Sequence, residues 1–201
     1  MVLTAFLLRA PSPLLPAQLL WVNLVTDALP ALALGSDPPQ DDVMQSPPNP
    51  QDKTVFSNGL GLAMVTEGMM IGVLALLAFS IGRTVFDADP ASPAIGRTMA
   101  FAVLSLSQLV HSFNMRSAKP VLGKGFFGNR MLNLSFLVCA GLMIGVIAFP
   151  PAAVLFSSVP LTPVQWGIVA GLSAMPLVLC EAEKRLSRVA KPKKAVSMRQ
   201  N

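Results

Sequence analysis

The chain has 201 residues, of which 53% are hydrophobic and 12% are charged, and its mean hydropathy is +0.60. A soluble globular domain carries about 25% charged residues, so this composition excludes one and indicates a membrane protein with several crossings. The net charge of +5 does not indicate nucleic-acid binding, because the basic residues crowd together after the last apolar run. Such an end is typical of a cytosolic terminus facing anionic lipid, and the expected partner is the bilayer.

Five apolar runs are long enough to cross a bilayer, since a helical crossing needs about 20 residues. They cover residues 15–35, 58–82, 95–114, 131–149 and 162–181, and the apolar residues 1–9 indicate the end of a truncated helix before them. Proline is tolerated at a helix start and breaks a helix interior, so Pro16 is expected at the start of the first span and Pro150 at the end of the fourth. The expected fold class is an all-α membrane protein, a helical bundle of five full spans and a partial N-terminal one.

The distribution of basic residues predicts the orientation of the spans. The loop 115–130 contains Arg116, Lys119, Lys124 and Arg130, whereas the loop 150–161 contains no Lys or Arg and the loop 83–94 contains only Arg83. Basic loops stay in the cytosol, so the loop 115–130 and the C-terminus are predicted to be cytosolic. We expect an integral, multi-pass transmembrane domain over residues 1–184 and a basic cytosolic tail over residues 185–201.

The first full span contains the strongest candidates for a binding site. Asn23, Thr26 and Asp27 are spaced i, i+3 and i+4, so they share one face of a helix. An ionisable residue inside a membrane is costly and is by default a candidate functional group. Pro30 has no N–H and leaves a carbonyl near Thr26 without its helical partner. These oxygens suit Ca²⁺ or a similar cation, and the alternative is a polar cluster that only holds helices together.

The same stretch carries a resemblance to a known family. Residues 20–27 read Leu-Trp-Val-Asn-Leu-Val-Thr-Asp, followed by Ala28 and Leu-Pro-Ala, and the flank contains Gly-Ser-Asp-Pro-Pro at residues 35–39 and Asp-Asp-Val-Met at residues 41–44. This resembles the sixth transmembrane helix and following loop of the P-type calcium-transporting ATPases, which are type II cation pumps. The resemblance implies the carboxy-terminal transmembrane region of such a pump, from the end of the fifth helix through the tenth, in a bacterial plasma membrane.

The resemblance also implies roles for particular residues. Asn23 and Asp27 match ligands of the transported Ca²⁺, and Thr26 matches a ligand of a second calcium site. That second site also uses a Glu in the eighth helix, where this chain has Gln108. An amide keeps an oxygen donor and loses a charge, so a pump that binds one cation is expected. Mn²⁺ also accepts oxygen ligands, and a Mn-selective pump is an alternative.

Two further polar residues lie inside predicted spans. His111 follows Gln108 by one turn and is a candidate for an ion-path or proton-binding group; the plainer interpretation is a neutral histidine hydrogen-bonded between helices. Glu67 lies about 13 Å into the second span at 1.5 Å per residue, so it is either a proton acceptor in the bundle or a protonated carboxyl bonded to a neighbour. Cys139 and Cys180 are expected to be small core residues, and glycine pairs such as Gly68 and Gly72 indicate close helix packing.

The sequence contains no phosphorylated-aspartate motif and no glycine-rich phosphate loop. The chain alone is therefore not expected to hydrolyse ATP, and ATP and Mg²⁺ would act only through other domains of a pump. The expected partners are the phosphorylation, nucleotide-binding and actuator domains and helices one to five. The alternative from another functional class is a non-transporting helical membrane module, a remnant that folds or binds a partner without moving ions.

Overall fold

A computed structural model describes residues 11–36, 60–116 and 128–190. Throughout these residues the regular structure is helical and contains no strand, which confirms the predicted all-α class. The predicted partial helix over residues 1–9 lies outside the described residues. So do most of the loops 36–57 and 115–130, including Asp37, Asp41 and Asp42, and the last part of the basic tail.

All five predicted spans are helical. In chain order the long segments are α2 (Pro16–Trp21) with η1 (Val22–Thr26) and α3 (Ala28–Gly35), then α4 (Leu60–Ile81) with η4 (Gly82–Phe86), then α5 (Ala94–Met115), α6 (Arg130–Ala148) and α8 (Pro163–Ala190). Pro16 occupies the first turn of α2, as predicted. The last helix continues to Ala190, nine residues beyond the predicted span end at 181, where the sequence turns from apolar to charged.

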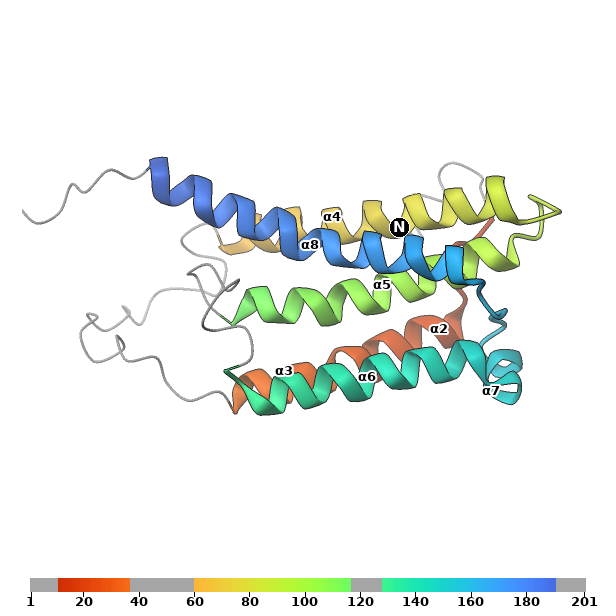
Figure 1. Cartoon of the computed structure of the whole chain (residues 1–201), viewed down its shortest axis with the longest axis horizontal. Coiled ribbons are helices and arrows are strands. Elements are labelled where there is room, and N and C mark those ends of the chain that lie inside the picture. The colour runs from red at the N-terminus through yellow and green to blue at the C-terminus, as the bar shows by residue number, and fades with distance from the viewer. Residues whose placement is uncertain (1–10, 37–59, 117–127, 191–201) are drawn as a thin grey trace, which may run out of the picture.

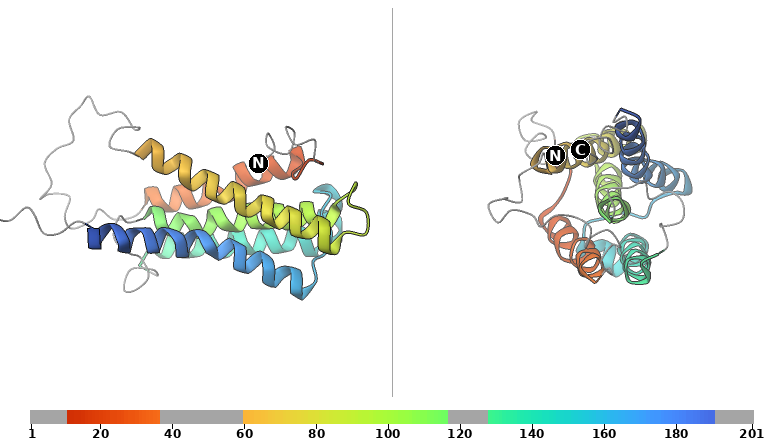
Figure 2. Two further views of the ribbon diagram at one scale, coloured as in Figure 1. Left: turned by 90° about the horizontal axis from the view of Figure 1, so that it is seen from above. Right: turned by 90° about the vertical axis from the view of Figure 1, so that its left-hand side faces the viewer.

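The long helices run side by side along the bundle (Figure 1). Seen from its end, α5 lies between the pair α4 and α8 on one side and the pair α3 and α6 on the other (Figure 2). α5 contacts α4, η4, α8, α6, η1 and α3, so it is the centre of the bundle. The buried core follows this arrangement, because Met99, Phe101, Val103 and Leu109 of α5 are completely buried.

The central position of α5 explains why it is less apolar than its neighbours. Of the helices that the structure describes, four are both long and apolar enough to cross a membrane: Pro16–Gly35, Gly61–Phe86, Arg130–Ala148 and Pro163–Arg185. α5 has 22 residues, which is also sufficient length, but it carries buried polar residues, namely Thr98, Ser105, Ser107, His111, Ser112 and Asn114. A helix surrounded by protein can carry polar groups that lipid-facing helices cannot. With α5, the described residues contain five helices of spanning length, as the five apolar runs of the sequence predicted.

Glycine gives the closest approach between two helices, at a place that the sequence patterns do not mark. A Cβ on Gly82 would lie 2.4 Å from the Cα of Gly96, so η4 and α5 meet backbone to backbone. The predicted glycine pairs behave differently, since a Cβ on Gly68 or Gly72 would meet no atom within 4 Å. The same holds for two further glycine pairs of this spacing, 141 with 145 and 167 with 171. The pairs indicated a packed bundle and no particular partner, and within the described helices a Cβ at any of these positions would have open space around it.

A corner between α6 and α8 fastens one end of the first span. The short helix α7 (Pro150–Leu155), which the sequence did not predict, ends at Phe156, and Ser157 takes a left-handed conformation with φ of 48°. The amide of Gln18 donates to the Phe156 carbonyl at 3.0 Å, and the ring of Phe156 lies 5.0 Å from that of Trp21. The corner thereby holds α2 against the rest of the bundle.

Candidate cation site

The first span is not a continuous α-helix at its polar residues. Residues 22–26 form a π-helix, and Asp27 lies at its junction with α3. Pro30 supplies no N–H one turn later, as the sequence indicated. The Thr26 hydroxyl donates to the Val22 carbonyl at 2.6 Å within the π segment. π-bulges inside α-helices occur often at functional sites, and this one lies directly before the carboxylate of Asp27.

A pocket of about 210 Å³ lies between this break and α5. It is lined by Thr26, Asp27, Pro30, Ala31 and Leu34 from the first span and by Gln108, His111, Ser112 and Met115 from α5. The Thr26 hydroxyl lies 3.4 Å from the Gln108 amide oxygen, so the two helices meet through polar atoms at the pocket. The structure therefore brings Thr26 and Asp27 together with Gln108, which lies 82 residues after Thr26 in the sequence.

Asn23 does not line this pocket. Its side chain is exposed on the described bundle, as that of Asp27 largely is. The role of Asn23 as a ligand therefore stays a prediction. Asp27 lies directly after the π-helix, between it and α3.

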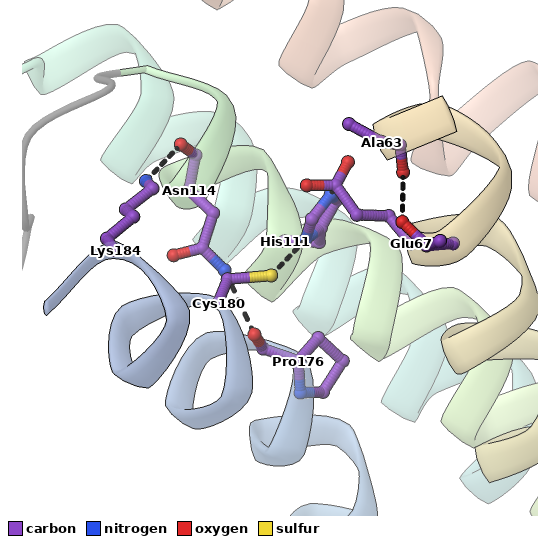
Figure 3. Close-up of polar contacts among 8 residues, drawn as sticks. Ala63, Glu67, His111, Asn114, Pro176, Cys180 and Lys184 are labelled. Atoms are coloured by element: carbon purple, nitrogen blue, oxygen red, sulfur yellow. Dashed lines mark hydrogen bonds and ion pairs between the residues drawn. The ribbon is translucent and has the colours of Figure 1, made fainter. Parts of the chain in front are cut away.

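His111 joins the pocket to a second polar group behind α5. Its Nε2 lies 3.3 Å from the Glu67 carboxylate of α4, and its Nδ1 lies 3.9 Å from the Cys180 thiol of α8. Figure 3 shows these three side chains converging where α4, α5 and α8 meet. His111 is buried, whereas the Glu67 side chain is 27% exposed. Both ring nitrogens therefore already have polar partners while one edge of the ring reaches the pocket.

Asn114, near the C-terminal end of α5, makes two further hydrogen bonds between α5 and α8. Its side-chain amide donates to the Pro176 carbonyl of α8 at 3.2 Å, and its backbone carbonyl accepts from Lys184 Nζ at 2.8 Å (Figure 3). Sequence reasoning did not single out Asn114 or Cys180 as part of this network. Their place in apolar helices was the available signal, because a polar group inside a membrane needs a partner.

The pocket presents hard oxygen donors from a carboxylate, a hydroxyl and a side-chain amide. These suit Ca²⁺, which takes six to eight oxygen ligands, so the pocket supplies part of one coordination shell. In the part of the chain that the structure describes, no group of three or more His, Cys, Asp and Glu side chains is placed to hold a metal ion. The described side chains therefore do not form a zinc site, which needs at least three such ligands.

Comparisons with known proteins give the family that the chain resembles. A family model described as "Cation transporting ATPase, C-terminus" matches residues 11–186. The chain is 45% identical over 177 residues to the calcium-transporting ATPase of Bacillus subtilis (strain 168), which covers 88% of this chain and 20% of that protein. It is 41% identical over 193 residues to calcium-transporting ATPase 1 of Bacillus cereus (strain ATCC 10987 / NRS 248), with 90% and 22% covered. It is 32% identical over 189 residues to calcium-transporting ATPase type 2C member 2 of Mus musculus, with 89% and 19% covered. The chain thus spans about a fifth of the length of these relatives.

Proposed function

Because the chain belongs to the cation-transporting ATPase family, whose carboxy-terminal region it matches, we propose that it supplies part of the cation pathway of an ATP-driven pump. The observation that carries this proposal is the pocket between the π segment and α5, where Thr26, Asp27 and Gln108 meet. Membrane transporters commonly place substrate ions at interrupted helices, because unwound carbonyls and polar side chains replace the water lost by the ion. Irregular backbone at membrane depth is tolerated where it lines such a cavity.

The remaining parts of the pump would come from domains outside this segment. ATP and Mg²⁺ would act on phosphorylation and nucleotide-binding domains, and a further carboxylate from another helix would complete the coordination shell. Asn23 fits this scheme, since it is exposed on the described bundle and can meet a helix that the bundle does not contain. Phosphorylation would then change the geometry around Asn23 and Asp27 and switch access between the two sides of the membrane.

We place the segment in the bilayer with its C-terminus in the cytosol. The ends of α3, α5 and α8 and the beginning of α6 gather at one end of the bundle (Figure 1). Arg116, Arg130, Lys184 and Arg185 lie at that end. Lys and Arg near helix ends favour the cytosolic side. We expect the basic residues 185–201 to lie in the cytosol next to anionic lipid, and we expect a bacterial plasma membrane.

Asp27→Asn in the intact pump tests the proposal. By intact pump we mean the protein in which this segment is joined to its phosphorylation domain. The change removes the one carboxylate of the pocket, so phosphorylation from ATP should no longer respond to Ca²⁺, while phosphorylation from inorganic phosphate persists because the fold is intact. Asp89→Asn, the same chemical change on an exposed loop residue, should leave Ca²⁺ dependence unchanged. Unchanged Ca²⁺ affinity in the Asp27 variant would remove Asp27 from the set of ligands.

We further propose that one cation binds per cycle. Gln108 places a neutral amide at the α5 side of the pocket, where a carboxylate would be required for a second strongly bound divalent cation. Equilibrium binding of labelled calcium, counted against phosphorylation sites, should give a ratio near one, and a ratio of two would contradict the proposal. Gln108→Glu should not raise this ratio, because one added carboxylate does not supply six to eight oxygens.

Mn²⁺ is the second candidate for the transported ion, and the observation that favours it is the imidazole of His111 at the pocket wall. Nitrogen ligands suit transition metals better than Ca²⁺. Phosphorylation measured at graded concentrations of each ion separates the two. We expect half-maximal activation at a lower concentration of Ca²⁺ than of Mn²⁺, because both nitrogens of His111 are already engaged by Glu67 and Cys180.

The non-transporting alternative rests on the chain spanning about a fifth of its relatives. A chimera separates the hypotheses. Residues 11–186 would replace the matching segment of the Bacillus subtilis calcium-transporting ATPase, to which the chain is 45% identical. Calcium uptake into vesicles by the chimera is the expected result. A chimera that inserts and accepts phosphate from inorganic phosphate, yet transports nothing, would favour the non-transporting module.

A further inference from the structure

We infer that α6 positions the cation site from outside the pocket, by holding the backbone of the first span with side-chain donors, and that Cys139 is the positioning residue at the site itself. This inference rests on the proposed function. It concerns three α6 residues that the pocket does not contain, Asn129, Ser135 and Cys139.

The donors contact three carbonyls on one face of the first span. Asn129 Nδ2 donates to the Ala33 carbonyl at 3.0 Å, at the inner end. One turn further along, Ser135 Oγ donates to the Leu29 carbonyl at 3.3 Å. The Cys139 thiol donates to the Val25 carbonyl at 3.3 Å. The donors advance along α6 while the carbonyls run back along the first span, so α6 follows the first span antiparallel along its length.

Much of the exposed surface of α6 is apolar. Leu134, Leu137, Val138 and Leu142 are all more than 40% exposed, as expected for side chains that face lipid. The three donors contact the first span instead. Interhelical hydrogen bonds from small side chains hold membrane helices together where apolar packing gives little preference for one neighbour. Their targets here are backbone carbonyls, so these bonds fix the position of the main chain.

The contact of Cys139 differs from the other two because of its target. Val25 belongs to the π segment and precedes Thr26 and Asp27. At a π-to-α junction the backbone has more carbonyls than helical N–H groups, and the missing N–H of Pro30 adds to this excess. The thiol gives a donor to one of these carbonyls in a region without water. The neighbouring hydroxyl of Thr26 does the same for Val22, at 2.6 Å.

Loss of the thiol should therefore act on the site through the backbone. Without the thiol, the Val25 carbonyl loses a hydrogen-bond donor. A regular α-helix could give this carbonyl an N–H partner, so the π segment would become less stable relative to the α-helical form. That change would rotate Thr26 and Asp27 relative to Gln108 across the pocket. Cation binding should weaken, although Cys139 touches neither the cation nor the pocket.

The experiment compares Cys139→Ala and Cys139→Ser in the intact pump, with the Ca²⁺ concentration for half-maximal phosphorylation from ATP as the readout. Cys139→Ala should raise this concentration about three- to tenfold, the range expected for one hydrogen bond, with the maximal phosphoenzyme level unchanged. Cys139→Ser keeps a donor at the same place and should stay within about twofold of the wild type. A thermal transition measured for each variant reports folding separately.

Two control variants give the result its meaning. Val138→Ala, on the lipid-facing side of the same turn, should leave the Ca²⁺ dependence unchanged. Met143→Ala removes a completely buried side chain one turn further along the same interface, so it loosens the packing without removing a donor. The inference is overturned if Cys139→Ala matches the wild type, if Cys139→Ser shifts the Ca²⁺ dependence as far as Cys139→Ala, or if Met143→Ala reproduces the shift.

Failure of this inference and failure of the proposed function give different results. A wild-type pump whose phosphorylation does not depend on Ca²⁺ or Mn²⁺ contradicts the proposed function itself. A wild-type pump that depends on the cation, with a Cys139→Ala variant of unchanged affinity, contradicts the positioning role alone. If the alanine variant does not fold, Ser135→Ala tests the same contact of α6 with the first span, at the Leu29 carbonyl. This variant should raise the half-maximal Ca²⁺ concentration at least about twofold.

Discussion

The side chains of α6 named above donate to backbone carbonyls of the first span, whereas the junction of α4, α5 and α8 also contains side chains that contact one another. In the first interface the donors are neutral and the acceptors are Val25, Leu29 and Ala33. In the second interface a carboxylate, an imidazole and a thiol converge at His111. The pocket lies between the two interfaces, with one wall on the first span and the other on α5.

The difference separates two tasks that polar groups perform in a membrane bundle. Donors to carbonyls fix the position of the main chain. Side chains that pair with each other, as Glu67 and Cys180 do with His111, join helices through their polar ends. The main chain that supplies Thr26 and Asp27 is thus held from α6, and the pairing of carboxylate with imidazole is placed on the other side of α5.

Gly82→Ala should have the largest effect on the interface between α4 and α5. A Cβ there would lie 2.4 Å from the Gly96 Cα, and backbone cannot move aside as a side chain can. We expect a loss of about 3 kcal/mol in the free energy of unfolding, at the upper end of overpacking effects. Thermal denaturation in detergent measures the loss. Gly72→Ala, where the Cβ meets no atom within 4 Å, is the matched control and should change stability little.

His111→Ala should have the next largest effect, because it leaves Glu67 and Cys180 without their shared partner. The loss of the ring and of two polar contacts should cost about 2 kcal/mol. His111→Gln keeps a polar side chain and should recover part of this loss. Equal stability of the wild type and His111→Ala would show that this interface does not depend on the polar junction.

Asn129→Ala should have a smaller effect, on the other interface. Asn129 accepts from the Leu132 N–H at the start of α6 and donates to the Ala33 carbonyl. Loss of the cap and of the interhelical bond should cost about 1–2 kcal/mol. Asn129→Asp keeps the acceptor for the cap and removes the donor. The stability of this variant should lie between that of the wild type and that of Asn129→Ala. An Asp variant as stable as the wild type would show that the bond to Ala33 contributes nothing.

The sequence allowed the fold to be predicted at the level of helices and not at the level of their contacts. Each span is visible as an apolar run bounded by prolines or charges, so the five helices were predictable. Pro30 indicated a disturbed backbone near Thr26, but neither its π form nor the exposure of Asn23 follows from residue spacing. The close contact between Gly82 and Gly96 had no local pattern either, because the two glycines lie on different segments.

The candidate site shows the same division. Thr26 and Asp27 could be singled out because polar residues are rare in apolar spans. Their distance from Gln108 could not, since it depends on how two helices far apart in sequence pack. Cys139 was expected to be a small core residue, and it is buried as expected. Its bond to the Val25 carbonyl had no sequence signal, because the partner is a main-chain atom that every residue possesses.

The contacts that hold the first span also bear on the order in which the protein is assembled during synthesis. The donors on α6 lie 96, 106 and 114 residues after the carbonyls that they contact, and Phe156 lies 138 residues after Gln18. A chain made from its N-terminus therefore inserts the first span long before these partners exist. Until α6 arrives, a span with a carboxylate and a broken backbone must remain in the lipid, or in the insertion machinery, without its donors. Chains stalled on the ribosome before and after residue 150 would test this order. The accessibility of a cysteine introduced into the first span to a labelling reagent should differ between the two stalled chains.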